Sequence, residues 1–290
     1  MATDPNKDAL TGTETTGHEW DGIRELDNPL PKWWLYVMYA CILWSVGYYF
    51  LYPAIPWLDG HTKGTLGYTE RTRLVEDIAE ARAAQASYFK QIETSSLAEI
   101  RANQNLLDFA NAGGRASFAE NCAPCHGSGA AGGPGYPNLA DDDWLWGGKL
   151  ENIYATLRHG VRWPQDEDTR VSDMPRFGEE ELLTKAQISD VAEYVLSFTD
   201  KSEDAAAAGR GKAIYAEQCV ACHGPTGDGN MEVGAPRLND AIWFYGDDKA
   251  TVAAQIAGPQ QGVMPSWQGR LDDVTLKMLT VYVHSLGGGQ

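Results

Sequence analysis

The string Cys-x-x-Cys-His occurs twice in this chain, as "CAPCH" and as "CVACH". Each copy holds two cysteines and a histidine directly after the second: Cys122, Cys125 and His126 in the first, and Cys219, Cys222 and His223 in the second. Four of the five cysteines therefore lie in two close pairs, which is not the spacing of a disulfide framework in a chain of 290 residues. Whatever group these strings hold, the fold has to build the same local site twice.

The sequence around the two strings is repeated as well. "RASFAENCAPCHG" aligns with "KAIYAEQCVACHG", "YPNLADDDWLWGG" with "APRLNDAIWFYGD", and "MPRFG" with "MPSWQG". Two copies of one module of about 85–90 residues explain this pattern. We place them at residues 113–200 and 205–290, with "TDKSEDAAAAG" as the hinge. Each module predicts a helix before the cysteines, a loop rich in glycine and proline, and a terminal helix that closes the module. Thr184 and Gln187 predict the capping box of the first terminal helix.

Three chemistries use cysteines and histidine at close spacing. Structural zinc needs four ligands, whereas each string supplies three and places its histidine too near the second cysteine. A redox-active Cys-x-x-Cys belongs at a strand-to-helix junction in a βαβ pattern, which this sequence lacks. Cys-x-x-Cys-His is the attachment signal of c-type haem, where two thiols form thioethers and the imidazole becomes an axial iron ligand. The duplicated string therefore predicts two covalently bound haem c groups per chain.

A six-coordinate haem needs a second axial ligand. Met174 is the only methionine between the first cysteine pair and the hinge, Met264 occupies the matching position in the second module, and a proline follows each. A thioether ligand raises the reduction potential of a haem. We expect Met174 to serve the first iron and Met264 the second, although the sequence leaves open whether a methionine reaches the iron of the other module. His159 is a rival for the first iron, but a propionate contact or an exposed position is the favoured interpretation. Met278 lacks a counterpart and is expected to be a packing residue.

Residues 33–58 contain no charged side chain. Their first twenty residues are long enough to cross about 30 Å of hydrocarbon as a helix, and aromatic residues at both ends match the interfacial belt. Pro53 and Pro56 are expected to end this helix. Residues 1–32 are polar and acidic, which is unlike a cleavable signal peptide. The chain is thus expected to cross a membrane once.

Basic residues on the two sides of the span give no orientation. Covalent haem attachment takes place on the outer face of an energy-transducing membrane, so residues 59–290 are expected in the periplasm and residues 1–32 in the cytoplasm. Residues 59–112 predict a helical connector in which Ser96 and Glu99 form a capping box. Packing against its neighbours or a partner protein, and a solvated linker, both remain open for it. The net charge of −17 argues against nucleic acid as a partner and fits either solubility or a basic protein partner.

The chain as a whole resembles subunit III, the di-haem cytochrome c subunit of bacterial cbb3-type cytochrome c oxidases. The resemblance rests on "DGIRELDNPLPKWW" and "YYFLYPAIPW", together with the tandem haem strings, and it covers residues 20–290. It implies a mainly α fold with one N-terminal transmembrane helix followed by two tandem class I-like cytochrome c domains. It also implies a place in the bacterial inner membrane.

In this family, the di-haem subunit accepts electrons from a donor cytochrome c and passes them to a mono-haem subunit, from which they reach the catalytic haem-copper subunit that reduces oxygen to water. The resemblance therefore implies an electron-transfer subunit without an active site of its own, with those two subunits and the donor as partners. Carried over by position, it assigns Cys122, Cys125, His126 and Met174 to one haem and Cys219, Cys222, His223 and Met264 to the other. A free-standing di-haem carrier is the alternative. A haem-based sensor would favour an open sixth position, which the two methionines oppose.

Overall fold

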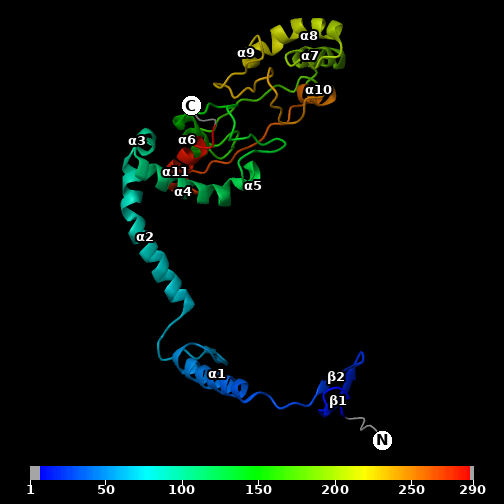
Figure 1. Ribbon diagram of the computed structural model, residues 1–290. Coiled ribbons are helices and arrows are strands. Elements are labelled where there is room, and N and C mark those ends of the chain that lie inside the picture. Colours follow the sequence, from blue (N-terminus) through cyan, green and yellow to red (C-terminus); the bar gives the residue numbers. More distant parts are fainter. Residues whose placement is uncertain (1–6, 288–290) are drawn as a thin grey trace. The chain divides into compact units, whose positions relative to one another are not determined.

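The computed structural model describes residues 7–287, and the chain divides near residue 84 into two compact units. The architecture is mainly helical, as the sequence predicts (Figure 1). The elements of the first unit are β1 (Thr15–Trp20), β2 (Ile23–Leu26), α1 (Lys32–Leu51), β3 (Pro56–Trp57), β4 (Gly60–His61) and most of α2 (Glu70–Thr94). Strands β1 and β2 form an antiparallel hairpin that we did not predict, although the Asp-Gly dipeptide between them is a common two-residue turn.

Helix α1 has the properties of a membrane span. None of its residues is buried, and it is the one helix among residues 7–287 long and apolar enough to cross a bilayer. Its last residue is Leu51, and Tyr52 is already extended before Pro53. Because proline disfavours a helical conformation in the residue before it, this end confirms the predicted stop.

The regular structure described in the second unit is helical. Its elements are α3 (Leu97–Ala102), α4 (Gln104–Asn121), α5 (Ala123–His126), α6 (Leu150–His159), α7 (Lys185–Ser197), α8 (Ala205–Gln218), α9 (Val220–His223), α10 (Lys249–Ala257) and α11 (Asp273–His284). Both predicted capping boxes are present, at Ser96 and Glu99 before α3 and at Thr184 and Gln187 before α7.

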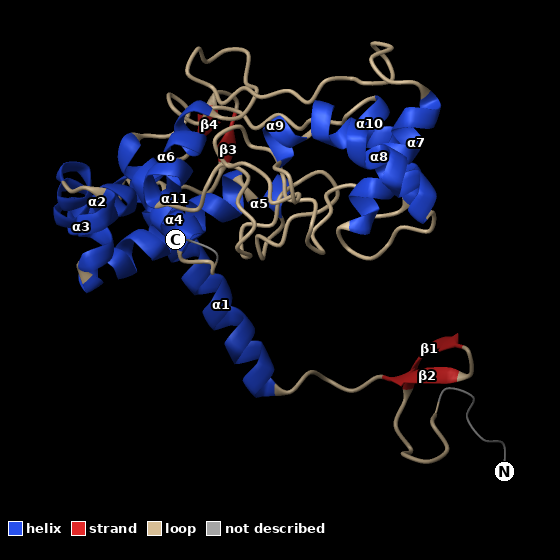
Figure 2. Ribbon diagram, turned by 90° about the horizontal axis from the view of Figure 1, so that it is seen from above, coloured by secondary structure: helices blue, strands red, loops and turns tan. Residues whose placement is uncertain are grey.

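The two repeats exchange their terminal helices. Helix α7 of the first repeat packs against α8 and α10 of the second, whereas α11 of the second packs against α4 and α6 of the first. Figures 1 and 2 both show these two groups of helices. We call α4, α5, α6 and α11 the first lobe, and α7, α8, α9 and α10 the second lobe. The prediction that each module is closed by its own terminal helix is therefore wrong, because each terminal helix packs in the lobe of the other repeat. The bounds 113–200 and 205–290 of the two modules stay a prediction.

Two glycines at equivalent positions of the repeats allow this packing. A Cβ atom on Gly114 in α4 would collide with the carbonyl oxygen of Met278 in α11. A Cβ atom on Gly211 in α8 would collide in the same way with the carbonyl oxygen of Asp190 in α7. Each exchanged helix therefore approaches the backbone of its partner at a point where only glycine fits.

The end of the connector packs against the first lobe. Ile92, Leu97 and Ile100 are buried in one cluster with Leu150 of α6 and Met278 of α11. Of the two possibilities that the sequence left open, packing applies to this part of the connector. The packing role expected of Met278 is confirmed, since its side chain is 4% exposed.

A buried carboxylate fixes the hinge between α7 and α8. Glu193 of α7 is 1% exposed and accepts hydrogen bonds from the Ser202 hydroxyl at 2.7 Å and the Glu203 backbone N–H at 3.0 Å. Its other oxygen lies 2.9 Å from the Lys249 ammonium of α10. The Lys249 hydrogen bond, assisted by those from the hinge, outweighs burial and lowers the pKa of Glu193 to about 2.

This carboxylate predicts a pH dependence of stability. Because the folded-state pKa lies below the ordinary value of 4.5, the ionised group stabilises the fold above about pH 4.5, and that contribution is lost as the pH falls toward 2. At about 1.4 kcal/mol per pKa unit, the loss reaches roughly 3 kcal/mol. Urea unfolding between pH 5 and 2 should show a smaller decline for Glu193→Gln than for the unsubstituted chain. The exposed neighbour Glu203→Gln is the control, and identical pH profiles for all three proteins would contradict the assignment.

Candidate haem-binding sites

Each Cys-x-x-Cys-His string forms one helical turn directly after a longer helix. Helix α5 follows α4, and α9 follows α8. In both turns the backbone N–H of the second cysteine donates to the carbonyl of the first at 3.1 Å. The first cysteine of each pair, Cys122 or Cys219, is buried, the second, Cys125 or Cys222, is exposed, and all four are free thiols. The duplication seen in the sequence is thus also a duplication of local geometry.

The buried cysteines do not have the properties of redox-active thiols. Burial, with a smaller contribution from Cys125, raises the pKa of Cys122 to about 11. Burial and Cys222 raise the pKa of Cys219 to about 11 in the same way. A dithiol catalyst needs a thiol whose pKa is lowered, because the thiolate is the nucleophile. The structure therefore agrees with the sequence in disfavouring a thioredoxin-like role.

A backbone carbonyl orients each motif histidine. The Nδ1 atom of His126 lies 3.1 Å from the carbonyl oxygen of Pro137, and that of His223 lies 3.0 Å from the carbonyl oxygen of Pro236. Since a carbonyl only accepts, Nδ1 carries the proton in both rings, which leaves the Nε2 lone pair free for a metal. Burial lowers the pKa of both histidines, which favours the neutral ring.

Sequence reasoning missed the two prolines. Pro137 and Pro236 lie in the aligned segments "YPNL" and "APRL". The available signal was that a proline occurs at the equivalent position after both haem strings, which indicates that this part of the loop has the same structural role in both repeats.

The two methionines lie in the opposite lobes from those expected. Met264 packs against the cluster that contains Cys122, and its backbone pairs with Val161 through hydrogen bonds of 2.9 and 3.0 Å. Met174 packs against the cluster that contains Cys219. Met174 precedes the terminal helix α7 and Met264 precedes α11, and each methionine lies in the same lobe as the helix that follows it. The packing therefore favours the crossed pairing that the sequence left open, because Met174 of the first repeat packs against the cluster that holds the second motif's Cys219.

An unpaired guanidinium nitrogen in the first lobe fits a haem carboxylate. The Nε atom of Arg170 is buried and has no hydrogen-bond partner among residues 7–287. Arg170 is joined through Val161 to the segment of Met264, and its guanidinium lies 5.2 Å from the Trp146 ring. A buried donor without a partner costs free energy, and a propionate would satisfy it. The residues of this lobe therefore fit the group that the motif predicts.

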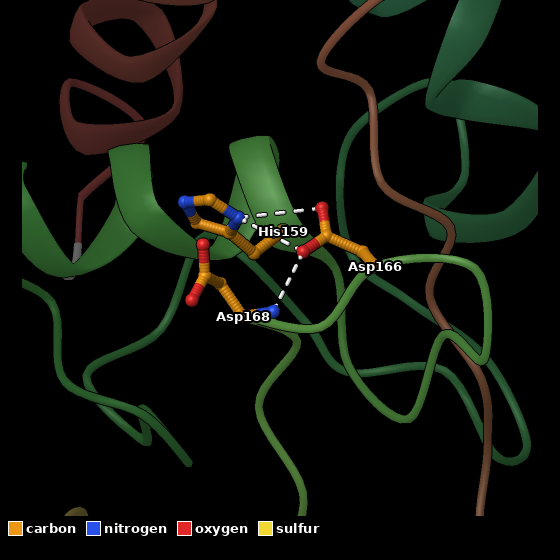
Figure 3. A group of neighbouring side chains, drawn as sticks. All are labelled: His159, Asp166 and Asp168. Carbon is orange, nitrogen blue, oxygen red and sulfur yellow. Dashed lines mark hydrogen bonds and ion pairs between the residues drawn. The ribbon is translucent and has the colours of Figure 1, made fainter.

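His159 is engaged by a carboxylate. It ends α6, and its Nδ1 atom lies 3.2 Å from Asp166 Oδ1. Figure 3 shows this pair with Asp168, whose backbone N–H also donates to Asp166, at 2.9 Å. The three side chains offer possible metal-ligand atoms within 4.8 Å of one another. The hydrogen bonds of Asp166 to His159 and to the Asp168 backbone N–H instead stabilise the loop after α6. The structure therefore gives His159 a partner in the loop that follows α6, and its contact with a propionate stays a prediction.

Family models match three parts of the chain. The N-terminal domain of cytochrome oxidase-cbb3, FixP, matches residues 12–59. Cytochrome c matches residues 112–199, and cytochrome C oxidase, cbb3-type, subunit III, matches residues 206–283. The second and third matches follow the two sequence repeats.

Curated relatives align along the whole chain. A cbb3-type cytochrome c oxidase subunit CcoP of Azospirillum brasilense is 54% identical over 98% of this chain and 98% of its own length. A subunit FixP of Sinorhizobium medicae is 52% identical over 98% of this chain and 97% of its own. A subunit CcoP of Cereibacter sphaeroides is 48% identical over 100% of both.

Proposed function

The chain belongs to the family of cbb3-type cytochrome c oxidase subunits called CcoP or FixP, and we propose that it carries electrons from a donor cytochrome c toward the oxygen-reducing centre of such an oxidase. It is a membrane-anchored subunit with two cytochrome c domains. The observation that carries the proposal is the full-length match to these relatives together with two intact haem strings of equal local geometry.

Each lobe would hold one covalent haem c with a histidine and a methionine as axial ligands. We assign Cys122, Cys125, His126 and Met264 to the first lobe, and Cys219, Cys222, His223 and Met174 to the second. Haem supplies a reversible one-electron exchange between ferrous and ferric iron. The exchanged methionines are supported by the packing of Met264 near Cys122 and of Met174 near Cys219.

The protein orients the two histidine ligands and surrounds each haem site with apolar side chains. The carbonyls of Pro137 and Pro236 fix the orientation of the two histidines, and such partners tune the electronic properties of a ligand. The apolar clusters around the motifs exclude water, which together with a thioether ligand favours a high potential. We assign no general acid, base or nucleophile, so the chain has no active site of its own and serves the oxidase by outer-sphere electron transfer.

Helix α1 would anchor the chain in the bacterial inner membrane, with the lobes in the periplasm and the N-terminal tail in the cytoplasm. The catalytic haem-copper subunit and the mono-haem cytochrome c subunit are the proposed neighbours in the complex. The match of residues 12–59 to a domain named for this oxidase supports the oxidase over a free-standing carrier. Purification in mild detergent tests this choice, because only a subunit of the oxidase should co-migrate with b-type haem and oxygen-reducing activity.

The haem assignment is tested directly on the denatured chain. A pyridine haemochrome assay with intact mass should give two haem c groups on a polypeptide of 31.7 kDa. Cys219→Ala should weaken covalent attachment in the second lobe only and lower haem-stained intensity on a denaturing gel by at most half, because one of the two thioethers of that lobe is lost. Cys41→Ala, in α1, should keep full intensity and is the matched control. Undiminished staining of the Cys219→Ala chain would show that this cysteine holds no haem.

A further inference from the structure

The loops that orient the two histidines contain glycines at equivalent positions of the repeats. Gly135 lies two residues before Pro137, and Gly234 lies two residues before Pro236. Their φ angles are +79° and +61°, so both are in the left-handed region that favours glycine. The position of each glycine therefore influences the carbonyl that holds the histidine of its own repeat.

An aromatic side chain of the other repeat covers each glycine. A Cβ atom on Gly135 would lie 3.1 Å from Cε1 of Tyr245, and the Gly135 N–H donates to the carbonyl of Phe244 at 2.9 Å. A Cβ atom on Gly234 would collide with the ring of Trp146. Trp146 and Tyr245 are themselves equivalent in the repeat alignment, so the contact is reciprocal.

The contact joins the two lobes at their histidine loops. Gly135 and Trp146 lie between α5 and α6 of the first lobe, and Gly234 and Tyr245 lie between α9 and α10 of the second. Unlike the methionines, these segments stay with the lobe of their own repeat. Each lobe thus receives support for its histidine loop from an aromatic residue of the other lobe.

We propose that Tyr245 and Trp146 are positioning residues that act across the lobe interface: Tyr245 holds the loop that orients His126, and Trp146 holds the loop that orients His223. This inference depends on the proposed function, because it takes both histidines as axial haem ligands. Removal of a ring leaves the loop beneath it free to move, since a gap has no atoms to hold its lining in place. The histidine–carbonyl hydrogen bond of that lobe then opens more often, while the bond in the lobe that lost the ring stays closed.

The test measures exchange of the histidine Nδ1–H protons in the full-length, haem-loaded chain in detergent, reduced to the ferrous state and observed by NMR. Tyr245→Ala should accelerate exchange at His126 at least tenfold and leave His223 within twofold of the unsubstituted chain. Trp146→Ala should give the reverse pattern. Tyr245→Phe and Trp146→Phe keep a ring over the glycine and should restore slow exchange at both histidines. A role in overall stability alone would not produce this crossed pattern.

Milder variants keep the test decisive if an alanine variant fails to fold. Tyr245→Leu and Trp146→Leu retain much of the side-chain volume and should give the same crossed pattern with smaller amplitude. Acceleration at the histidine of the substituted repeat, at both histidines equally, or at neither would overturn the inference while leaving the haem assignment intact. Absence of haem-bound histidine signals from the unsubstituted chain would instead overturn the proposed function and this inference with it.

Discussion

Replacing Met264 with histidine is expected to lower the reduction potential of the haem attached at Cys122 and Cys125, although Met264 belongs to the other repeat. Imidazole stabilises ferric iron more than a thioether does. We expect a fall of about 0.2–0.4 V, a part of the roughly 0.8 V range over which axial ligands set haem potentials. The second haem should keep its potential, because Met264 packs in the first lobe.

A chain that carries a single haem identifies which iron has changed. With Cys219 and Cys222 both replaced by alanine, the haem that remains is the one in the first lobe. In this background Met264→His should lower the measured potential, and the matched variant Met174→His should leave it unchanged. The opposite result would restore the pairing by sequence order. No shift with either variant would show that neither methionine binds the first iron.

Leu279→Ala in α11 is expected to destabilise the lobe that holds the first haem rather than the second. Leu279 is 0% exposed and lies in one cluster with Phe118 and Cys122. Truncation of a buried leucine to alanine costs about 2–5 kcal/mol. Urea unfolding, followed through the visible spectrum of each haem, should show an earlier loss of the native spectrum of the first haem.

The matched variant is Val191→Ala in α7. Val191 occupies the position equivalent to Leu279, is also 0% exposed, and lies in one cluster with Tyr215 and Cys219. This variant should destabilise the second lobe, by a smaller amount because fewer carbon atoms are removed. If Leu279→Ala instead weakened the second lobe and Val191→Ala the first, the helix exchange described above would not exist in solution.

Local signals predicted the local structure well. The capping residues Ser96 and Thr184 begin their helices as expected, and Pro53 marks the end of α1. The helix predicted before each haem string is present as well, as α4 and α8. Such features need no knowledge of which distant segments meet.

The sequence patterns of the helices could not predict the helix exchange. Because of the duplication, α7 could pack against either α4 or α8, and α11 against the other, with almost equivalent contacts. Gly114 and Gly211 offer the same close approach, and α7 and α11 carry buried apolar residues at the same positions. One signal that was available is the short hinge between Ser197 and Ala205. Consecutive helices joined by a short connection usually pack as neighbours, which favours α7 against α8 over the pairing within each repeat.

The candidate ligands of the site came from the sequence, and their binding to haem stays a prediction, whereas the groups that support them came from the structure. The four cysteines, two histidines and two methionines follow from motif and repetition alone. The carbonyls of Pro137 and Pro236 and the unpaired nitrogen of Arg170 do not, because their importance appears only when the chain is folded around them. The sequence left open whether a methionine reaches the iron of the other repeat, and the helix exchange, which places Met264 in the first lobe and Met174 in the second, favours that possibility.

The exchange also sets an order of events while the chain is being made. Helix α4 leaves the ribosome about 150 residues before α11, the helix that covers it. At about 5–20 residues per second, the wait is roughly eight to thirty seconds. During that interval the second lobe can assemble its α7–α8 pair, whereas the earlier-made haem string stays uncovered. The haem site that comes first in the sequence is thus completed last. A chain that ends before α11 would carry Cys122 and Cys125 in a lobe that lacks the helix packed against α4 and α6.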